Sequence, residues 1–201
     1  MKFEIKSRYN GSVLFAMETE SLKLCLELAV KSGASLDGAS LDHASLDHAS
    51  LIGASLNHAS LNGASLDHAS LIGASLIGAN GINKNLCTPL QILLDQPEKI
   101  HAYKLTTKNG DGVFNGGITY KIEKSYEVLD ANTDDTQQCS KGINLATLDW
   151  CMKNWKENYR ILIAEFTAKD IAAIPIATDG KFRVFRCKIV GEKNLVDIGL
   201  K

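Results

Sequence analysis

Residues 34–78 read ASLDG ASLDH ASLDH ASLIG ASLNH ASLNG ASLDH ASLIG ASLIG, so that Ala-Ser-Leu and two variable residues repeat nine times without a break. A degenerate tenth unit, ANGIN, follows at residues 79–83. On an α-helix, leucines five residues apart would be offset by about 140°, and on a flat strand they would alternate between the two faces. The leucines therefore share one interior only if the chain turns at every unit.

This pattern resembles that of the pentapeptide-repeat proteins, in which the central residue is Leu or Phe and the residue two positions earlier is commonly Ala. The resemblance implies a short right-handed quadrilateral β-helix, a solenoid with four pentapeptides per coil. It also implies that the alanines point inward and that the serines and both variable positions lie outside. The structural core that it implies consists of nine leucines: Leu36, Leu41, Leu46, Leu51, Leu56, Leu61, Leu66, Leu71 and Leu76.

The variable positions support a coil of four pentapeptides independently of the resemblance. Asp47-His48 recurs as Asp67-His68, and Ile52-Gly53 recurs as Ile72-Gly73. Equivalent residues four pentapeptides apart should then stack at the β-ladder spacing of roughly 4.8 Å. Nine units make only about two and a quarter coils, so both ends of this short solenoid need to be capped.

The flanking sequence predicts those caps. Segments 3–5 and 13–15 flank an Asn-Gly turn signal and indicate a β-hairpin. Residues 21–30 start with a serine and are followed by Gly33, which indicates a helix. Beyond the repeat, Thr88-Pro89 opens a predicted helix over 90–96. We interpret both helices as plugs over the repeat core. The expected organisation is a hairpin and capping helix (1–33), the β-helix (34–83), a C-terminal capping helix (84–99) and a small α+β domain (100–201), which makes the fold class mainly β.

The C-terminal half has no repeat. Alternating patterns predict strands over 101–105, 118–122, 125–129, 159–167 and 181–190, and a helix is predicted over 146–155. Three runs, 142–151, 166–175 and 179–183, are similar to an uncharacterised domain found beside pentapeptide repeats in phage and bacterial proteins. That resemblance covers about residues 100–200 and implies no activity.

The last predicted strand is rich in cations. A β-bulge near Val184-Phe185 would bring four of them onto one face. They are Lys181, Arg183, Arg186 and Lys188. Two interpretations stay open: an anion-binding face for phosphate or nucleic acid, or a solvated strand face.

Composition narrows the class of protein. The chain has 201 residues, of which 22 are basic and 23 acidic, and its net charge of −1 argues against a general attraction to nucleic acid or to a membrane. No run of about 18 apolar residues predicts a membrane span, and no signal-peptide core follows Met1. The five cysteines are scattered without a Cys-x-x-Cys pair, which predicts reduced thiols and a cytoplasmic location.

Motifs that carry chemistry are missing from the sequence. It contains no glycine-rich phosphate loop, no His-Glu-x-x-His and no Gly-x-Ser-x-Gly. We therefore expect no catalytic residue, no cofactor and no metal site. One alternative stays open at His48 and His68, where stacked imidazoles would either bridge a transition metal or form a polar surface ladder.

Isoleucines are the remaining surface clue. Ile52 and Ile72 should stack on one outer face and Ile77 should lie on the next, where neighbouring units carry Asp or Asn. They predict a packing surface. In our preferred interpretation the C-terminal domain packs on it; in the alternative a second copy of the chain does, which would form a homodimer. The leading functional hypothesis is a non-enzymatic protein-interaction scaffold with a protein partner that the sequence does not identify.

Two other functions stay open. Some pentapeptide-repeat proteins mimic duplex DNA and inhibit DNA gyrase, and residues 34–83 carry four aspartates and no Lys or Arg, which gives a charge of −4. Two coils nevertheless span only about 10–15 Å, against about 34 Å for one turn of the duplex. The other hypothesis is an enzyme activity in residues 100–201, which turnover lost on deletion of that part would reveal.

Overall fold

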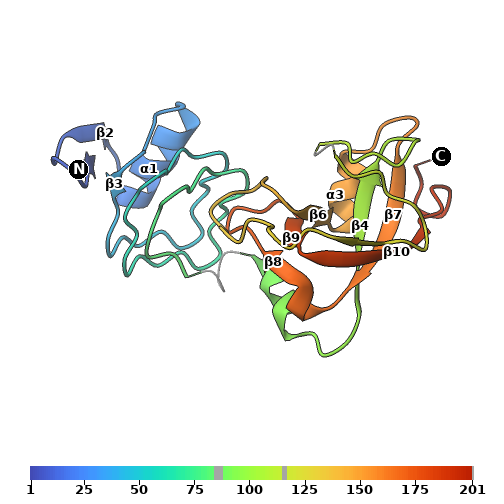
Figure 1. The fold of residues 1–201 in the computed structure, drawn as a ribbon. Coiled ribbons are helices and arrows are strands. Elements are labelled where there is room, and N and C mark those ends of the chain that lie inside the picture. The colour runs from blue at the N-terminus through green and yellow to red at the C-terminus, as the bar shows by residue number, and fades with distance from the viewer. Residues whose placement is uncertain (84–87, 115–116, 201) are drawn as a thin grey trace. The chain divides into compact units, whose positions relative to one another are not determined.

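The computed structural model describes residues 1–83, 88–114 and 117–200 (Figure 1). The chain forms two compact units. The first consists of Met1–Pro89, Asp135–Gln138 and Pro175–Asp179, and the second of Leu90–Asp134, Cys139–Ile174 and Gly180–Lys201. Where the sequence suggested one boundary near residue 100, the first unit takes two short segments from the C-terminal half. None of the described helices is long and apolar enough to cross a membrane.

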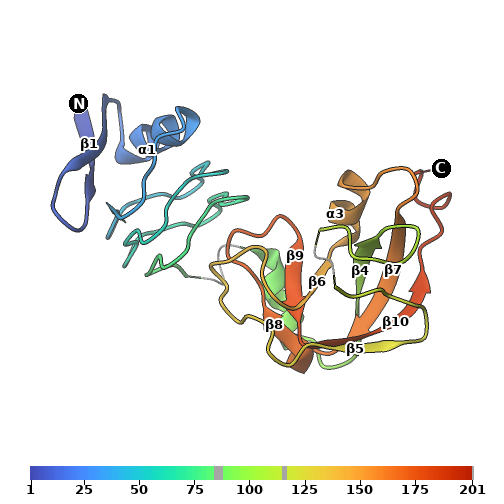
Figure 2. The same cartoon turned by 45° about the horizontal axis from the view of Figure 1, so that its top comes forward.

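The N-terminal hairpin and helix are confirmed. Strands β1 (Lys2–Ser7) and β2 (Val13–Glu18) pair antiparallel, and β1 also pairs with β3 (Ala39–Ser40) in the first coil of the repeat. Helix α1 (Leu22–Lys31) begins at Ser21, whose side chain accepts a hydrogen bond from Leu24 N at 3.1 Å. Cys25, Leu26 and Ala29 of α1 are buried in the same core as the repeat leucines. Figures 1 and 2 show α1 beside the first coil, which it covers.

The repeat segment returns to the same place after every fourth pentapeptide, as predicted. Parallel bridges join Ser35 to Ser55, Ser40 to Ser60, Ser45 to Ser65, Ser50 to Ser70 and Ser55 to Ser75. All nine leucines are buried, none exposing more than 3% of its surface. Each bridge involves a single residue on either side, because two of the five residues in every pentapeptide form a turn. Within the repeat only β3 is long enough to be a strand. The named sheets are both antiparallel.

The predicted plug at the other end of the repeat is wrong. Residues 84–87 of that segment lie outside the described residues, and Pro89–Asp95 forms a 3₁₀ helix, η1. Two of its leucines, Leu90 and Leu93, pack against the core of the second unit. Ile176 and Ala177 join the repeat core instead, and Ala177 O accepts a hydrogen bond from Gly73 N at 3.2 Å. The last coil is therefore capped by chain that lies about a hundred residues further on.

The second unit is built on one antiparallel sheet of seven strands, ordered β5-β10-β7-β4-β6-β9-β8. Its strands are β4 (Ile100–Thr106), β5 (Ser125–Glu127), β6 (Ile143–Ala146), β7 (Arg160–Phe166), β8 (Ile171–Ala173), β9 (Lys181–Val184) and β10 (Arg186–Glu192). The longest pairing joins β4 to β7, from Ile100 opposite Phe166 to Thr106 opposite Arg160. Helix α3 (Leu148–Lys153) lies beside β4 in Figures 1 and 2, and η2 (Ala168–Asp170) follows β7.

Both faces of this sheet bury apolar residues because its strands alternate with period two. Ala102, Leu162 and Ala164 belong to one core, whereas Leu105 and Ile161 belong to another that includes Trp150 and Cys151 of α3.

Three predicted elements differ from the structure. Residues 118–122 form no strand, since Thr119 makes only an isolated bridge to Asp111. The predicted helix 146–155 is shorter and starts later, because Ile143–Ala146 pairs with β9 as a strand. The predicted strand 181–190 is divided at Phe185 into β9 and β10.

Candidate functional site

Each pentapeptide turns at its fifth residue. These nine residues all have positive φ angles, between 57° and 73°: Gly38, His43, His48, Gly53, His58, Gly63, His68, Gly73 and Gly78. In this left-handed region glycine is unstrained, and among other residue types histidine is enriched. The restriction of the fifth position to Gly and His is visible in the sequence, and it is the signal of the turns that our sequence interpretation missed.

Rings from one coil lie over glycines of the next. A Cβ atom added at Gly63 would stand 2.6 Å from His43 Nδ1, and one at Gly78 would stand 2.4 Å from His58 Nδ1. Tyr9 of the hairpin covers Gly38 of the first coil in the same way. At Gly38, Gly63 and Gly78, glycine is therefore required both by the backbone angle and by the neighbouring ring.

We expect Gly63→Ala to destabilise the first unit by about 2 kcal/mol, because alanine meets both the left-handed backbone and the His43 ring. Gly53→Ala is the matched control, since Gly53 has a similar φ of 72° but nothing within 4 Å of its added Cβ. That control should cost only about 1 kcal/mol. Urea denaturation followed by circular dichroism measures both, and equal losses in the two variants would contradict the ring contact.

The metal alternative at the histidines is not supported. The His48 and His68 rings stack with centroids 5.1 Å apart and planes inclined by 8°. Their nitrogen lone pairs lie in nearly parallel planes, which do not meet at one ion. Across residues 1–83, 88–114 and 117–200, no group of three His, Cys, Asp or Glu side chains could hold a metal ion. The stacked pair fits the polar surface ladder.

The fourth residue of a pentapeptide bridges successive coils when it is Asp or Asn. The Asp42 carboxylate accepts hydrogen bonds from Ser60 Oγ at 2.5 Å and from Asn62 N at 2.9 Å. Asp37 and Asp47 accept the equivalent pairs of bonds, and Asn57 Oδ1 accepts from Ser75 Oγ and Ile77 N. These three aspartates hold one coil to the next, so most of the negative charge of the repeat has a structural role.

We expect the first unit to lose stability in acid. The hydrogen bond from Ser60 lowers the pKa of Asp42, and that from Ser65 lowers the pKa of Asp47, in each case below 3.8. The stabilisation is complete above the unfolded-state pKa and is lost as the pH falls through the folded-state pKa. An acid titration by circular dichroism should show this loss below about pH 4. Asp42→Asn, which keeps the acceptor as Asn57 does, should reduce the pH dependence; an unchanged profile would contradict it.

The fourth position carries isoleucine in one column of the repeat, where a column means equivalent positions four pentapeptides apart. Ile52 and Ile72 form that column, and they expose 55% and 48% of their surfaces. Ile77, in the adjacent column, exposes 45%. We call these three side chains the isoleucine surface. The segments from the C-terminal half that join this unit bury Ile176 and Ala177 but leave the isoleucine surface exposed.

The predicted cation face does not exist. Arg183 is completely buried, and its guanidinium donates to Asn132 O at 2.9 Å and also to Asp134 O. Lys181, on the same strand, lies with Nζ 3.6 Å from Cys139 Sγ and 5.1 Å from the centre of the Trp150 ring.

The other two cations belong to β10 and are paired with acids. Arg186 forms an ion pair with Glu127, and Lys188 Nζ lies 2.7 Å from Glu123. The bulge that would have aligned all four cations is absent, because Phe185 leaves the sheet pattern: its N donates to Asp170 O and its O accepts from Val128 N. Strands β9 and β10 consequently have different neighbours in the sheet.

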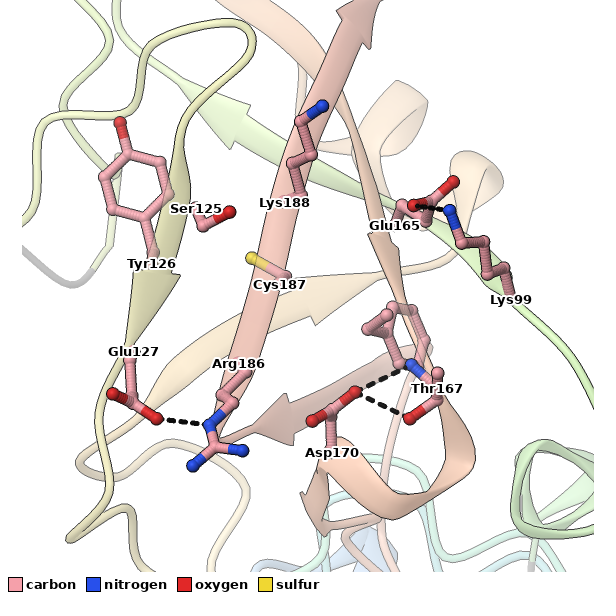
Figure 3. A pocket seen from close by; sticks show the side chains of 11 residues that line it. Lys99, Ser125, Tyr126, Glu127, Glu165, Thr167, Asp170, Arg186, Cys187 and Lys188 are labelled. Carbon is pink, nitrogen blue, oxygen red and sulfur yellow. Dashed lines mark hydrogen bonds and ion pairs between the residues drawn. The ribbon is translucent and has the colours of Figure 1, made fainter.

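A pocket of about 530 Å³ lies beside β5, β10 and β7 (Figure 3). Glu165 lies between Lys99 Nζ at 2.8 Å and His101 Nε2 at 3.5 Å, and the bond from Lys99 lowers the pKa of Glu165. Asp170 accepts from Thr167 N and Oγ1, as the dashed lines in Figure 3 show. Both carboxylates thus have hydrogen-bond partners, and the cations Arg186 and Lys188 of the pocket are paired with acids.

Cys187 also lines this pocket. Burial raises the pKa of Cys187 to about 12, so this group stays protonated at neutral pH and is no nucleophile. Four cysteines, Cys25, Cys139, Cys151 and Cys187, are free thiols, and Cys87 lies outside the described residues.

Comparison with known proteins identifies the repeat. Residues 32–63 and 49–80 match the family described as pentapeptide repeats, in 8 copies. No curated protein and no solved structure matches the chain. The match covers the repeat only, so it supports the first resemblance seen in the sequence and leaves the second, in the C-terminal half, without support.

Proposed function

We propose that this protein, whose residues 32–80 are a pentapeptide-repeat segment, is a non-enzymatic scaffold for protein interaction. The proposal includes a right-handed quadrilateral β-helix as the form of the repeat. Parallel bridges between serines four pentapeptides apart and a left-handed turn at every fifth residue support that form. Free thiols at four cysteines support a cytoplasmic location.

The observation that carries the proposal is the isoleucine column. In the other three columns, the fourth residue of the upper coil is Asp or Asn and binds the coil below through a serine hydroxyl and a backbone N–H. Isoleucine cannot accept these bonds, so Ile52 gives up contacts of roughly 1 kcal/mol each and exposes an apolar side chain to water. A position that loses stability in this way is best explained by contact with a partner.

The chemistry around the column indicates the kind of partner. Asp47 and Asp67 occupy the column before it, and the repeat contains no lysine or arginine. A complementary partner would offer an apolar centre with basic residues at its rim. Three isoleucine side chains expose far less than the roughly 800 Å² that each side of a stable interface buries. A transient contact with another protein therefore fits better than a permanent homodimer.

The test is a double variant, Ile52→Asp with Ile72→Asp. Aspartate at position 52 can accept the same pair of bonds that Asp42 accepts in its own column, so we expect the melting temperature to be unchanged or higher. Proteins captured by the wild-type chain should no longer bind the double variant. Asp42→Asn is the matched control: it alters the same outer surface in another column and should retain the captured protein.

Each outcome of this capture experiment either supports or contradicts the scaffold proposal. Loss of one captured protein in the double variant but not in Asp42→Asn supports the scaffold, provided that the purified protein then binds the wild-type chain directly. Capture that is identical for all three chains would contradict it. Light scattering that shows a wild-type dimer and a monomeric double variant would replace the foreign partner by a second copy.

A further inference from the structure

A lysine lies inside the second unit, apart from the isoleucine surface and from the pocket of Figure 3. Lys104 is on β4 and exposes only 6% of its surface. Its Nζ donates to Asn144 O at 2.8 Å and stands 5.1 Å from the centre of the Tyr120 ring. An ammonium group has three donors, and this carbonyl is its one acceptor among the described residues.

The positive charge of Lys104 has no compensating acid. Within the described part of the chain it forms no ion pair, and the groups that act on its pKa through their charge are the thiols of Cys187, Cys151 and Cys139. Burial raises the pKa values of Cys151 and Cys187 to about 12, so these thiols are neutral when the lysine is charged. A buried charge without a partner is one of the costliest features of a protein interior.

A second buried donor lies on the same face of β4. Thr106 is completely buried, and its Oγ1 has no hydrogen-bond partner among the residues that the structure describes. Side chains two residues apart on a strand point to the same side, so Thr106 and Lys104 face the same interior. Buried polar groups nearly always have a partner, and an orphaned one calls for a bound water or ion.

We propose that Lys104 and Thr106 form a buried site for a small monovalent anion, of which a halide is the simplest. The ammonium supplies the charge and the hydroxyl supplies a second donor. A water molecule would satisfy the hydroxyl but would leave the charge uncompensated. The residue that pairs with Lys104 on β7 is Leu162, which is buried in the apolar core, and such surroundings favour a small ion.

The probe is sodium bromide, exchanged for sodium gluconate at constant ionic strength and pH 7. Fluorescence of Trp150 and Trp155 follows the second unit, in which both tryptophans lie. We expect bromide at ten times its dissociation constant to raise the melting temperature by about 5 °C. Lys104→Met should abolish the rise and Thr106→Val should reduce it at least by half. Lys153→Met, at an exposed lysine of α3, should leave it intact.

The outcomes separate cleanly. A rise in the wild-type chain that disappears in Lys104→Met and persists in Lys153→Met supports the site. Equal melting temperatures in bromide and gluconate would overturn it, and so would a rise of the same size in Lys104→Met. If Lys104→Met does not fold, Thr106→Val decides, because valine has nearly the shape of threonine and an undiminished rise in that variant refutes the site.

Discussion

Leu56→Ala will lower the free energy of unfolding of the first unit by about 2–5 kcal/mol. Leu56 is completely buried in the middle coil, between Leu36 and Leu76, which lie one coil away on either side. Hydrogen bonds between coils, such as Leu36 N to Ser55 O and Leu56 N to Ser75 O, hold the backbone around the cavity in place. The walls therefore cannot collapse, and the variant bears both the lost burial and the empty volume.

Urea denaturation followed by far-ultraviolet circular dichroism measures this effect. Ile77→Ala is the control, because it removes an apolar side chain of similar size from the outside of the same coils. We expect it to cost less than about 1 kcal/mol. If the two variants lose equal stability, the leucines do not form the core that supports the repeat.

Lys104→Met will stabilise the second unit by about 3 kcal/mol at pH 7 in a buffer without halide. Burial lowers the pKa of Lys104 from 10.5 to about 8. The cost of the buried charge is therefore complete below pH 8 and disappears as the pH rises to 10.5, where the amine is neutral in the folded chain and becomes neutral in the unfolded chain. The advantage of the methionine variant should be constant below pH 8 and shrink towards zero by pH 10.5.

Other groups beside Lys104 titrate in alkali, namely Tyr120, Cys187 and Cys151, whose pKa values burial raises. They are present in both proteins, so the difference between the two unfolding free energies isolates the lysine. Guanidinium chloride contains halide and has to be avoided; urea with tryptophan fluorescence is the measurement. An advantage that stays the same from pH 7 to pH 10.5 would show that the charge of Lys104 is not the cause.

The fold of the repeat was predictable because each pentapeptide carries the residues that determine its own conformation and burial. The leucine of every pentapeptide is buried, and the coil of four pentapeptides follows from two recurring pairs in the variable positions. Asp or Asn at the fourth position and Gly or His at the fifth record hydrogen bonding between coils and a left-handed turn, two effects that a search for hydrophobic periodicity does not detect.

The errors come from contacts between distant parts of the chain. Ile176 and Ala177 cap the repeat, although nothing near them in the sequence relates them to it. Local sequence therefore favours the nearer segment 90–96 as the cap. Arg183 alternates with apolar residues as a surface cation would. Its burial is possible because the carbonyls of Asn132 and Asp134, about fifty residues earlier, accept hydrogen bonds from its guanidinium. Phe185 ends one strand and starts another through bonds to Asp170 and Val128, which periodicity cannot reveal.

The stacking of equivalent positions also limits how the repeat can change in length. Inserting or deleting one pentapeptide would keep every leucine inside, but it would shift all columns below by one side of the coil. If the change falls between residues 52 and 63, Ile52 would no longer lie over Ile72, and the His43 ring would meet a different residue from Gly63. Adding or removing four pentapeptides together leaves every remaining residue in its original column. Length variants that retain the isoleucine surface will therefore differ by whole coils of four pentapeptides.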